Sequence, residues 1–252
     1  MNKAIKISAA VALAAALGAT TITPSQAASK TIVVATEGTY APFTYHNSAN
    51  KLTGYDVEVF TAVAKKAGYK VKFKETTWDG IFAGLVSKRW DAIANQVTIR
   101  ADRQALYDLT KPYTVSRYVV LTKSSDNRVS KVSDINGLTA AQSATSSFHD
   151  LAVQNGAKIE IVPGFADSVA LLQLGRVDVT LNDSLAAGDY IKNNRDAGIK
   201  IAATFGDPSN QGFVFRKNSG YVKAFNKALA ALQKNGTIAK LGKKYFGQDV
   251  SK

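Results

Sequence analysis

Two pairs of polar residues, each at the end of an expected strand, are the part of this sequence best suited to ligand chemistry. Asn95 and Gln96 lie at the end of one such strand, and Asn182 and Asp183 lie at the end of another. In open α/β sheets, ligands bind beyond the carboxyl ends of the strands. If the two strands belong to facing lobes, the four side chains line a shared cleft. The sequence therefore predicts a polar binding site between two lobes.

Arg103 and Asp183 are charged residues that suit a ligand with both charges, such as an amino acid. Its carboxylate favours an arginine fork together with hydroxyl and N–H donors, and its ammonium group favours a carboxylate acceptor. Arg103 follows Thr98 by five residues on an expected strand-to-loop transition. Two structural alternatives stay open at this point. Arg103 could be a surface arginine on a helix, and Asp183 could cap the next helix.

The sequence lacks the usual motifs of enzymatic chemistry. It has no Gly-x-Ser-x-Gly elbow, no phosphate loop and no Gly-x-Gly-x-x-Gly dinucleotide motif. Its histidines, His46 and His149, have no partners at metal-ligand spacing. The absence of cysteine excludes disulfides, thiolate ligands, a cysteine nucleophile and a lipid anchor on cysteine. We therefore expect no enzyme, no metal and no cofactor.

Strands and helices must position these residues. The sequence shows strand and helix patterns in alternation, which indicates an α/β protein with a mainly parallel sheet. Residues 31–36 are rich in β-branched side chains, and residues 71–74 alternate between apolar and polar with period two. Residues 56–67 carry a helical apolar stripe that stops at Gly68. The remaining expected elements are helices at 79–87, 146–154, 167–174 and 221–233, a shorter helix after Gly236, and strands at 92–97, 158–162 and 177–181.

An internal correspondence links the two halves of the chain. A shift of 87 positions gives five identities within residues 78–95 and places one aromatic residue on another. The shift aligns Ala83, Leu85, Arg89, Asp91 and Asn95 with Ala170, Leu172, Arg176, Asp178 and Asn182, and Trp78 with Phe165. Both windows read as a helix, a short turn and a strand. This similarity predicts two lobes built on the same plan.

The N-terminal segment is typical of a signal peptide. Lys3 and Lys6 precede an apolar run at 7–17, and Ser25-Gln26-Ala27 provides small residues for cleavage. The run is shorter than the ~20 residues of a membrane-spanning helix. We predict a signal peptide at 1–27 and a soluble, exported mature protein from Ala28, in the periplasm or at the cell surface and without a lipid anchor.

The net charge of the whole chain is +13, and the predicted signal peptide contributes two lysines and no acid, which leaves +11 for the mature protein. Such a balance indicates attraction to a polyanion. For an exported protein, an anionic cell-wall polymer or a membrane surface is a better candidate than nucleic acid. A solvated basic surface with no partner is the structural alternative.

Several stretches, in unbroken order from Thr31 to the end, carry a resemblance to a known family. They are Glu37-Gly-Thr-Tyr-Ala-Pro-Phe43, Leu52-Thr-Gly-Tyr-Asp-Val-Glu58, Trp78-Asp-Gly80, Asn95-Gln-Val-Thr-Ile-Arg-Ala-Asp-Arg103, Tyr107-Asp-Leu-Thr-Lys-Pro-Tyr113, Gly175-Arg-Val-Asp178, Asn235-Gly-Thr237 and Lys244-Tyr-Phe-Gly247. With these motifs the chain resembles the extracellular amino-acid-binding proteins of ABC importers, solute-binding protein family 3.

The resemblance implies a role for each matching residue. Arg103 would pair with the ligand carboxylate, helped by Thr98, and Asp183 would accept from the α-ammonium group. Thr145 and Ser146 would donate at a helix start, which suits an anion. The aromatic walls would be Tyr40 and Trp78, although Trp78 also suits a core position.

The sequence motifs Asn95-Gln96-Val97-Thr98 and Trp78-Asp79-Gly80 are most similar to those of the cystine-binding branch. Asn95 and Gln96 would then offer neutral polar contacts, and another polar amino acid remains an alternative to cystine. In one departure from the family pattern, Ala144 stands where the family usually has Gly before the Thr pair, which weakens the assignments in that turn.

The family also implies a two-lobed periplasmic-binding-protein type II fold with a ligand cleft and a two-strand hinge. The chain would cross between lobes near residues 115–119 and 203–213. Lobe 1 would hold 28–116 plus 212–252 and lobe 2 would hold 117–211. We expect a monomer that closes on its ligand and docks on an ABC permease, with no nucleic acid partner. The alternatives are a surface adhesion protein held electrostatically, and a dehydratase-like enzyme on the same scaffold.

Overall fold

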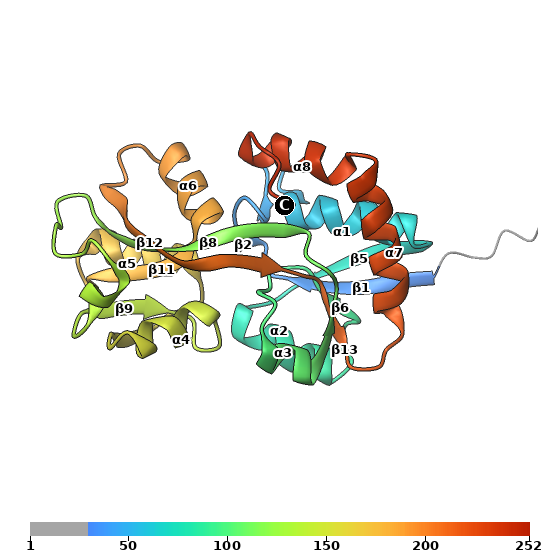
Figure 1. Ribbon diagram of the computed structural model, residues 1–252, viewed down its shortest axis with the longest axis horizontal. Coiled ribbons are helices and arrows are strands. Elements are labelled where there is room, and N and C mark those ends of the chain that lie inside the picture. Colours follow the sequence, from blue (N-terminus) through green and yellow to red (C-terminus); the bar gives the residue numbers. More distant parts are fainter. Residues whose placement is uncertain (1–29) are drawn as a thin grey trace, which may run out of the picture.

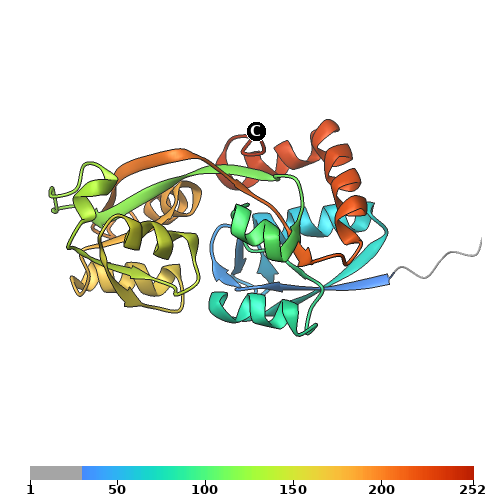
Figure 2. The ribbon, with the colours of Figure 1, turned by 60° about the horizontal axis from the view of Figure 1, so that its bottom comes forward.

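The computed structural model of the protein describes residues 30–252, so the predicted signal peptide and the predicted start at Ala28 lie outside the described residues. Within the described part, the chain forms two five-stranded sheets and one small three-stranded sheet. Figures 1 and 2 show two lobes, each with helices around its own sheet, joined by two long strands. The mixed α/β, two-lobed arrangement agrees with the predicted fold class.

The first lobe is built on a sheet with the strand order β5-β1-β6-β13-β7, in which β1 runs parallel to β5 and β6 while β13 runs antiparallel to β6 and β7. Its strands are β1 (Lys30–Thr36), β5 (Tyr69–Glu75), β6 (Ala92–Ile93), β7 (Tyr107–Leu109) and β13 (Val214–Arg216). Its helices are α1 (Tyr55–Lys66), α2 (Trp78–Val86), α3 (Ala101–Leu106), α7 (Tyr221–Lys234) and α8 (Thr237–Phe246). The small antiparallel sheet contains β2 (Thr39–Tyr40), β3 (Thr44–His46) and β4 (Leu52–Thr53).

The second lobe is built on a sheet with the order β10-β9-β11-β8-β12. Its strands are β8 (Thr114–Lys123), β9 (Thr139–Gln142), β10 (Lys158–Ile161), β11 (Val179–Asp183) and β12 (Ile199–Gln211). Its helices are α4 (Ser147–Gln154), α5 (Phe165–Leu174) and α6 (Ser184–Asn193), with a 3-10 turn at Val132–Ile135.

The long antiparallel strands β8 and β12 connect the lobes (Figure 1). The two predicted crossing segments, 115–119 and 203–213, overlap these strands. Their pairing has register shifts between Ile201 and Ala203 and between Phe205 and Ser209. The lobe boundaries at 116/117 and 211/212 stay predictions.

The two sheets follow the same plan, as the 87-residue shift predicts. Helix α2 and strand β6 in the first lobe match α5 and β11 in the second. Strand β1 in the first sheet and strand β9 in the second each lie between two parallel neighbours. The backbone N–H of Val33 donates to Asp91 Oδ2 at 3.0 Å, and that of Thr139 donates to Asp178 Oδ2 at 2.9 Å. The aligned aspartates therefore accept hydrogen bonds from equivalent strands, β1 and β9.

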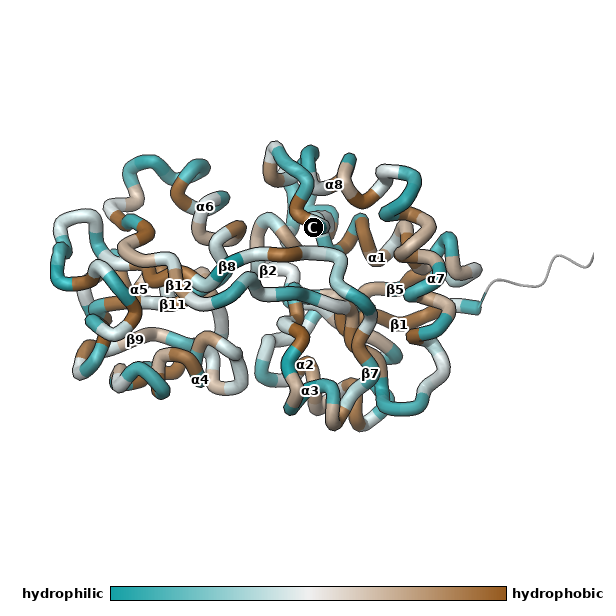
Figure 3. Tube along the Cα trace, in the orientation of Figure 1, coloured by the Kyte–Doolittle hydropathy of each residue, from teal (hydrophilic) through white to brown (hydrophobic). Residues whose placement is uncertain are grey.

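Hydrophobic periodicity explains why these segments form and where they pack. Val59, Phe60, Val63 and Ala64 recur on one face of α1 and are fully buried. Figure 3 shows hydrophobic residues gathered where α1 meets the strands of the first sheet. Strand β6 is shorter than the predicted 92–97, because the chain turns out of the sheet before Gln96, whose φ is +51°. This turn is the point at which the fold leaves the sheet to build the site.

Candidate functional site

A cleft between the two lobes contains about 490 Å³ of empty space, part of it open to solvent. Seven of the nine predicted ligand-binding residues line this cleft. They are Tyr40, Trp78, Asn95, Gln96, Thr98 and Arg103 from the first lobe and Ser146 from the second.

Arg103 is buried in the cleft wall and is 7% exposed. It lies on the short helix α3, so the predicted strand-to-loop position is wrong, and burial distinguishes it from an ordinary surface arginine. Its guanidinium donates to the Thr98 carbonyl at 3.1 Å and lies 5.5 Å from the Trp78 ring centroid. Burial, followed by the nearby charge of Arg100, lowers the pKa of Arg103 to about 10.

No Asp or Glu within residues 30–252 forms an ion pair with Arg103. A buried charge without a partner is costly, and a charged hydrogen-bond partner offsets that cost. The site is therefore suited to an anionic group beside Arg103.

Gln96 and Trp78 present buried polar atoms with no hydrogen-bond partner. These atoms are Gln96 Nε2, Gln96 Oε1 and Trp78 Nε1. The Gln96 backbone is held in its left-handed conformation by its own N–H, which donates to the buried Asp56 Oδ2 at 2.5 Å. Buried polar groups are normally paired, and strained residues gather at functional sites. This part of the wall is thus prepared for a polar ligand.

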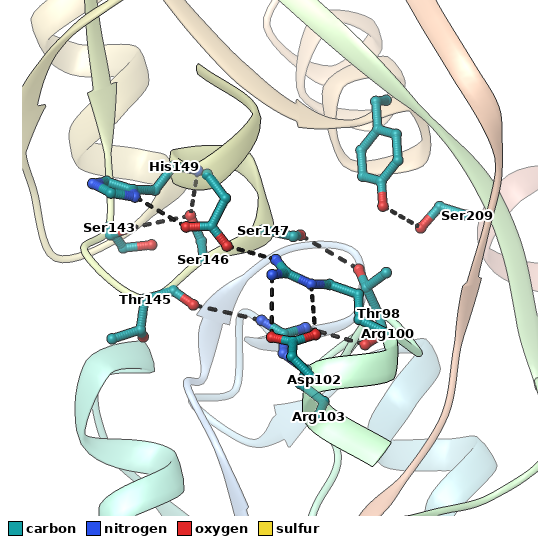
Figure 4. A network of polar contacts seen from close by, with 12 residues as sticks. Thr98, Arg100, Asp102, Arg103, Ser143, Thr145, Ser146, Ser147, His149 and Ser209 are labelled. Carbon is teal, nitrogen blue, oxygen red and sulfur yellow. Dashed lines mark hydrogen bonds and ion pairs between the residues drawn. The ribbon is translucent and has the colours of Figure 1, made fainter. Parts of the chain in front are cut away.

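The second lobe contributes the start of helix α4 to the cleft. Ser146 caps this helix, since its Oγ accepts from the His149 N–H at 3.1 Å and donates to the Ser143 carbonyl at 3.1 Å. The Ser147 hydroxyl lies 3.5 Å from the Thr98 hydroxyl of the first lobe. Figure 4 shows this network converging on Arg100 and Arg103. A helix start offers N–H groups to an anion.

Asp183 and Thr145 do not line the cleft. The Asp183 carboxylate caps α6 by accepting from the Leu185 N–H at 2.8 Å, and it also accepts from the Ser116 hydroxyl. Burial raises its pKa to about 6. The N–H and hydroxyl of Thr145 both donate to Asp79 Oδ1. The ligand roles of Asp183 and Thr145 stay predictions.

Glu37 is a cleft carboxylate that the sequence reasoning missed. It lines the cleft and accepts from Asn95 Nδ2 at 2.5 Å. Burial raises its pKa to about 7 despite the bond from Asn95, and the charge of Asp79 adds to the rise. Glu37 directly follows strand β1, so the strand-end rule that selected Asn95 and Asn182 would also have found it.

The second lobe also lines the cleft with residues that were not predicted. Asn182 was selected as a strand-end residue but not as a ligand contact, and Phe165 was aligned with Trp78 but not assigned to the site. The further residues of this wall are Gln142, Ser143, Ser147, Phe148 and Gly164. Gln142 ends strand β9, the counterpart of β1. No strand was predicted at 139–142, so the strand-end rule could not reach Gln142.

Direct contacts join the two lobes across the cleft. Tyr40 Oη donates to Asn182 Oδ1 at 2.7 Å, and Arg100 pairs with Asp150 at 2.7 Å. With the Asp79–Thr145 bonds, these contacts define a closed arrangement. A cleft of this kind, with a buried unpaired arginine and unpaired polar atoms, defines a two-lobed binding protein for a small polar ligand.

The chain belongs to the bacterial extracellular solute-binding proteins, family 3, whose pattern it matches over residues 32–248. It is 51% identical over 223 residues to the L-cystine-binding protein TcyA of Bacillus subtilis. The aligned region covers 88% of this chain and 83% of that protein. It is 35% identical over 226 residues to the L-cystine-binding protein TcyJ of Escherichia coli K12, with coverage of 88% and 85%.

Two solved structures bear on the arrangement of the lobes. The unliganded, open L-cystine receptor of Neisseria gonorrhoeae is 44% identical, covers 89% of this chain and 96% of its own, and superposes with a TM-score of 0.60. An ancestral arginine-binding protein bound to arginine is only 32% identical, with coverage of 86% and 98%, yet reaches 0.81. The more similar sequence superposes less well because its lobes are open, which agrees with the closed arrangement of this chain.

Within residues 30–252, no helix is long and apolar enough to cross a membrane. The same residues contain no cluster of three or more His, Cys, Asp or Glu side chains that could hold a metal ion.

Proposed function

We propose that this protein is the extracellular receptor of an ABC importer and binds L-cystine between its lobes. The observation that carries the proposal is the buried, unpaired Arg103 in a closed cleft with unsatisfied polar atoms. The names of the relatives TcyA and TcyJ support cystine as the ligand.

In the proposed complex, Arg103 and Thr98 bind one ligand carboxylate, with help from Thr145, Ser146 and the N–H groups at the start of α4. Glu37 and Asp183 are the acceptors for ammonium groups. Of these two, Glu37 lines the cleft and Asp183 does not.

The remaining lining residues complete the proposed site. Tyr40 and Trp78 are the aromatic walls predicted from the sequence, and Phe165 adds a third from the second lobe. Asn95 and Gln96 supply neutral polar contacts to the far end of the ligand. A buried polar contact that a wrong ligand cannot satisfy raises specificity.

Binding couples to hinged closure in this proposal. Lobe 1 (28–116 and 212–252) carries Arg103, and lobe 2 (117–211) carries α4, so only the closed form holds the ligand from both sides. A ligand that contacts both lobes shifts the population toward the closed form. The closed form docks on a membrane permease. The chain is exported by the predicted signal peptide and acts as a monomer in the periplasm or at the cell surface.

Calorimetric titration of the protein, refolded to remove bound ligand, with L-cystine and then with other amino acids tests the proposal. We expect one-to-one binding of cystine, lost in Arg103→Ala. Binding of a different amino acid instead of cystine would overturn the ligand assignment and keep the amino-acid receptor. No binding across the whole panel would overturn the receptor itself.

A dehydratase-like enzyme is a second candidate, favoured by one observation. Glu37 is a buried carboxyl in the cleft with its pKa raised to about 7, which suits a general acid near neutral pH. Turnover of prephenate-like acids that disappears in Glu37→Gln would establish this activity. Binding of cystine without turnover of such acids would exclude it.

A further inference from the structure

The positive charge of this protein is divided very unevenly between its two lobes. Residues 28–116 and 212–252 contain 21 Lys and Arg against nine Asp and Glu, a net charge of +12. Residues 117–211 contain nine basic and ten acidic residues, a net charge of −1. The excess of the mature chain therefore belongs to the first lobe.

Within the first lobe, exposed lysines gather on α1, β5, α7 and α8. Helices α1, α7 and α8 pack against one another and share a hydrophobic core with β1 and β5, so they cover one face of the first sheet as a single layer (Figures 1 and 2). Strand β5 turns Lys70, Lys72 and Lys74 to the opposite face, because they alternate with Tyr69, Val71 and Phe73, which pack into that core. We call the exposed side of the three-helix layer the lysine face. Its eight exposed lysines are Lys65, Lys66, Lys223, Lys227, Lys234, Lys240, Lys243 and Lys244.

The lysine face has few neutralising partners. Among its lysines, only Lys244 forms an ion pair within the described residues, with Glu58 at 2.6 Å. Glu58 is the one acidic residue of these three helices that is not fully buried. None of the eight lysines lines the ligand cleft. The face is thus a separate surface from the binding site, with a field that attracts anions.

The second lobe shows that solubility does not require this charge. It is built on the same plan and carries a net charge of −1. Lysines on an edge strand also block unwanted strand pairing. The matching edge strand of the second lobe, β10, carries Lys158 and Glu160, whereas β5 carries Lys70, Lys72 and Lys74. Edge protection concerns β5 alone and does not account for the lysines of the three helices.

The composition of the face selects the kind of partner. The exposed large hydrophobic residues of the described chain lie on other elements, so nothing on this face would insert into a lipid surface. The face has no arginine and no exposed aromatic side chain to stack on nucleic acid bases. Lysine is a flexible, strongly hydrated point charge that binds phosphate without a fixed geometry.

We propose that the lysine face binds a hydrated cell-surface polymer with repeating phosphate groups and so retains the protein near the cell. The chain has no cysteine to carry a lipid, and an electrostatic contact would serve the same purpose. Attachment through the first lobe leaves the second lobe free to move on β8 and β12. Polymer binding and amino-acid binding are therefore independent of each other.

The test measures binding of the purified protein to immobilised poly(glycerol phosphate) over a range of salt concentrations. One variant, Lys223→Glu/Lys227→Glu/Lys240→Glu, reverses three charges on the face. The matched control, Lys158→Glu/Lys192→Glu/Arg195→Glu, reverses three exposed charges on the second lobe and changes the net charge equally. Circular dichroism and calorimetry with the amino-acid ligand check that both variants fold.

We expect the wild-type affinity to fall steeply with salt, as counterions are released on binding. The face variant should bind at least about tenfold more weakly with a shallower salt dependence, whereas the control should change less than about twofold. Equal losses of affinity in both variants would show that only net charge matters. That result would overturn the proposal that the lysine face is the binding surface. Binding indifferent to salt, or tighter binding to phosphatidylglycerol vesicles than to the polymer, would overturn the proposed partner. Loss of ligand binding alone would leave this inference intact and contradict the proposed function.

Discussion

In the first lobe, Asp91 accepts the N–H of Val33 and pairs with Arg216 at 3.2 Å, and in the second lobe Asp178 accepts the N–H of Thr139 and pairs with Arg128 at 2.7 Å. The scaffold contacts of the two lobes are therefore nearly the same. Their contributions to the cleft differ. The first lobe supplies the buried charges, Arg103 and Glu37, and the second supplies neutral donors around the start of α4.

The same structural plan therefore supports both the scaffold and the binding site. Residues that hold strands by hydrogen bonds recur in both lobes because both sheets need them. Residues that face the cleft diverge because one ligand meets different lobes at its two sides. Trp78 and Phe165 illustrate the change, since they are aligned and both line the cleft, but only Trp78 lies against the guanidinium of Arg103.

The largest expected effect comes from the first lobe. Arg103→Ala should weaken ligand binding at least about 100-fold, because a charged, two-pronged partner of the carboxylate is lost from a buried site. Calorimetry measures the change. Arg103→Lys, which keeps the charge without the fork, should recover only part of the affinity. Equal affinity of Arg103→Ala and the wild type would contradict the assignment of the carboxylate to the first lobe.

Glu37 should make closure without ligand depend on pH. Burial in the closed form raises its pKa to about 7. We expect opening of the cleft to expose the carboxyl to water and return its pKa toward the ordinary value. The closed form therefore binds the extra proton. Closure is favoured as the pH falls below about 7, and that advantage is lost as the pH rises through 7.

Fluorescence energy transfer between dyes on the two lobes measures this closure in ligand-free protein. We expect the closing equilibrium to shift toward the closed form by more than about tenfold between pH 8 and pH 5. Glu37→Gln should flatten the profile, whereas Glu160→Gln, an exposed change on the second lobe, should not. An unchanged profile in Glu37→Gln would assign the titration to another group.

The aligned aromatic residues allow a direct comparison of the two lobes. Trp78→Ala should weaken ligand binding about tenfold, because it removes both an apolar wall and the cation–π contact that supports Arg103. Phe165→Ala should cost about threefold, as it removes only apolar wall. Calorimetry on both variants decides the order. A larger loss for Phe165→Ala would show that the second lobe holds the main aromatic contact.

Substitution of Asp91 or Asp178, which accept backbone hydrogen bonds from β1 and β9, should have the smallest effect. It should lower the stability of the protein and leave ligand binding unchanged. Asp91→Ala and Asp178→Ala each leave a backbone N–H without its acceptor, at a cost of about 1–3 kcal/mol in the free energy of unfolding. Asp91→Ala should cost more, since the Arg216 side chain is 23% exposed and the Arg128 side chain 56%. Urea unfolding measures both. A larger loss in the free energy of unfolding for Asp178→Ala than for Asp91→Ala would contradict the order expected from the exposure of the two arginines.

Much of the fold follows from the sequence, because the helical stripe of α1 and the alternation of β5 are local patterns of burial. The 87-residue shift located equivalent units through Asp91 and Asp178. The strand-end rule found Asn95 and Asn182 because both strands were recognised. Glu37 follows a strand that was predicted, so the rule could have reached it, whereas Gln142 ends strand β9, which the sequence pattern did not predict.

Other features of the site depend on distant contacts that no local pattern encodes. The shortness of β6 and the turn at Gln96 depend on Asp56, 40 residues away, which holds the Gln96 N–H. The side chain of Asp183 turns to cap α6 and to meet Ser116 on the hinge strand β8. Such choices are settled by tertiary packing.

Small-angle X-ray scattering with and without L-cystine measures whether the two unlike lobes close on one ligand. We expect an open ligand-free protein near pH 8 and a smaller radius of gyration when cystine is added. We expect no such change in Arg103→Ala at the same cystine concentration. An identical radius of gyration with and without cystine, under conditions where calorimetry shows binding, would contradict hinged closure.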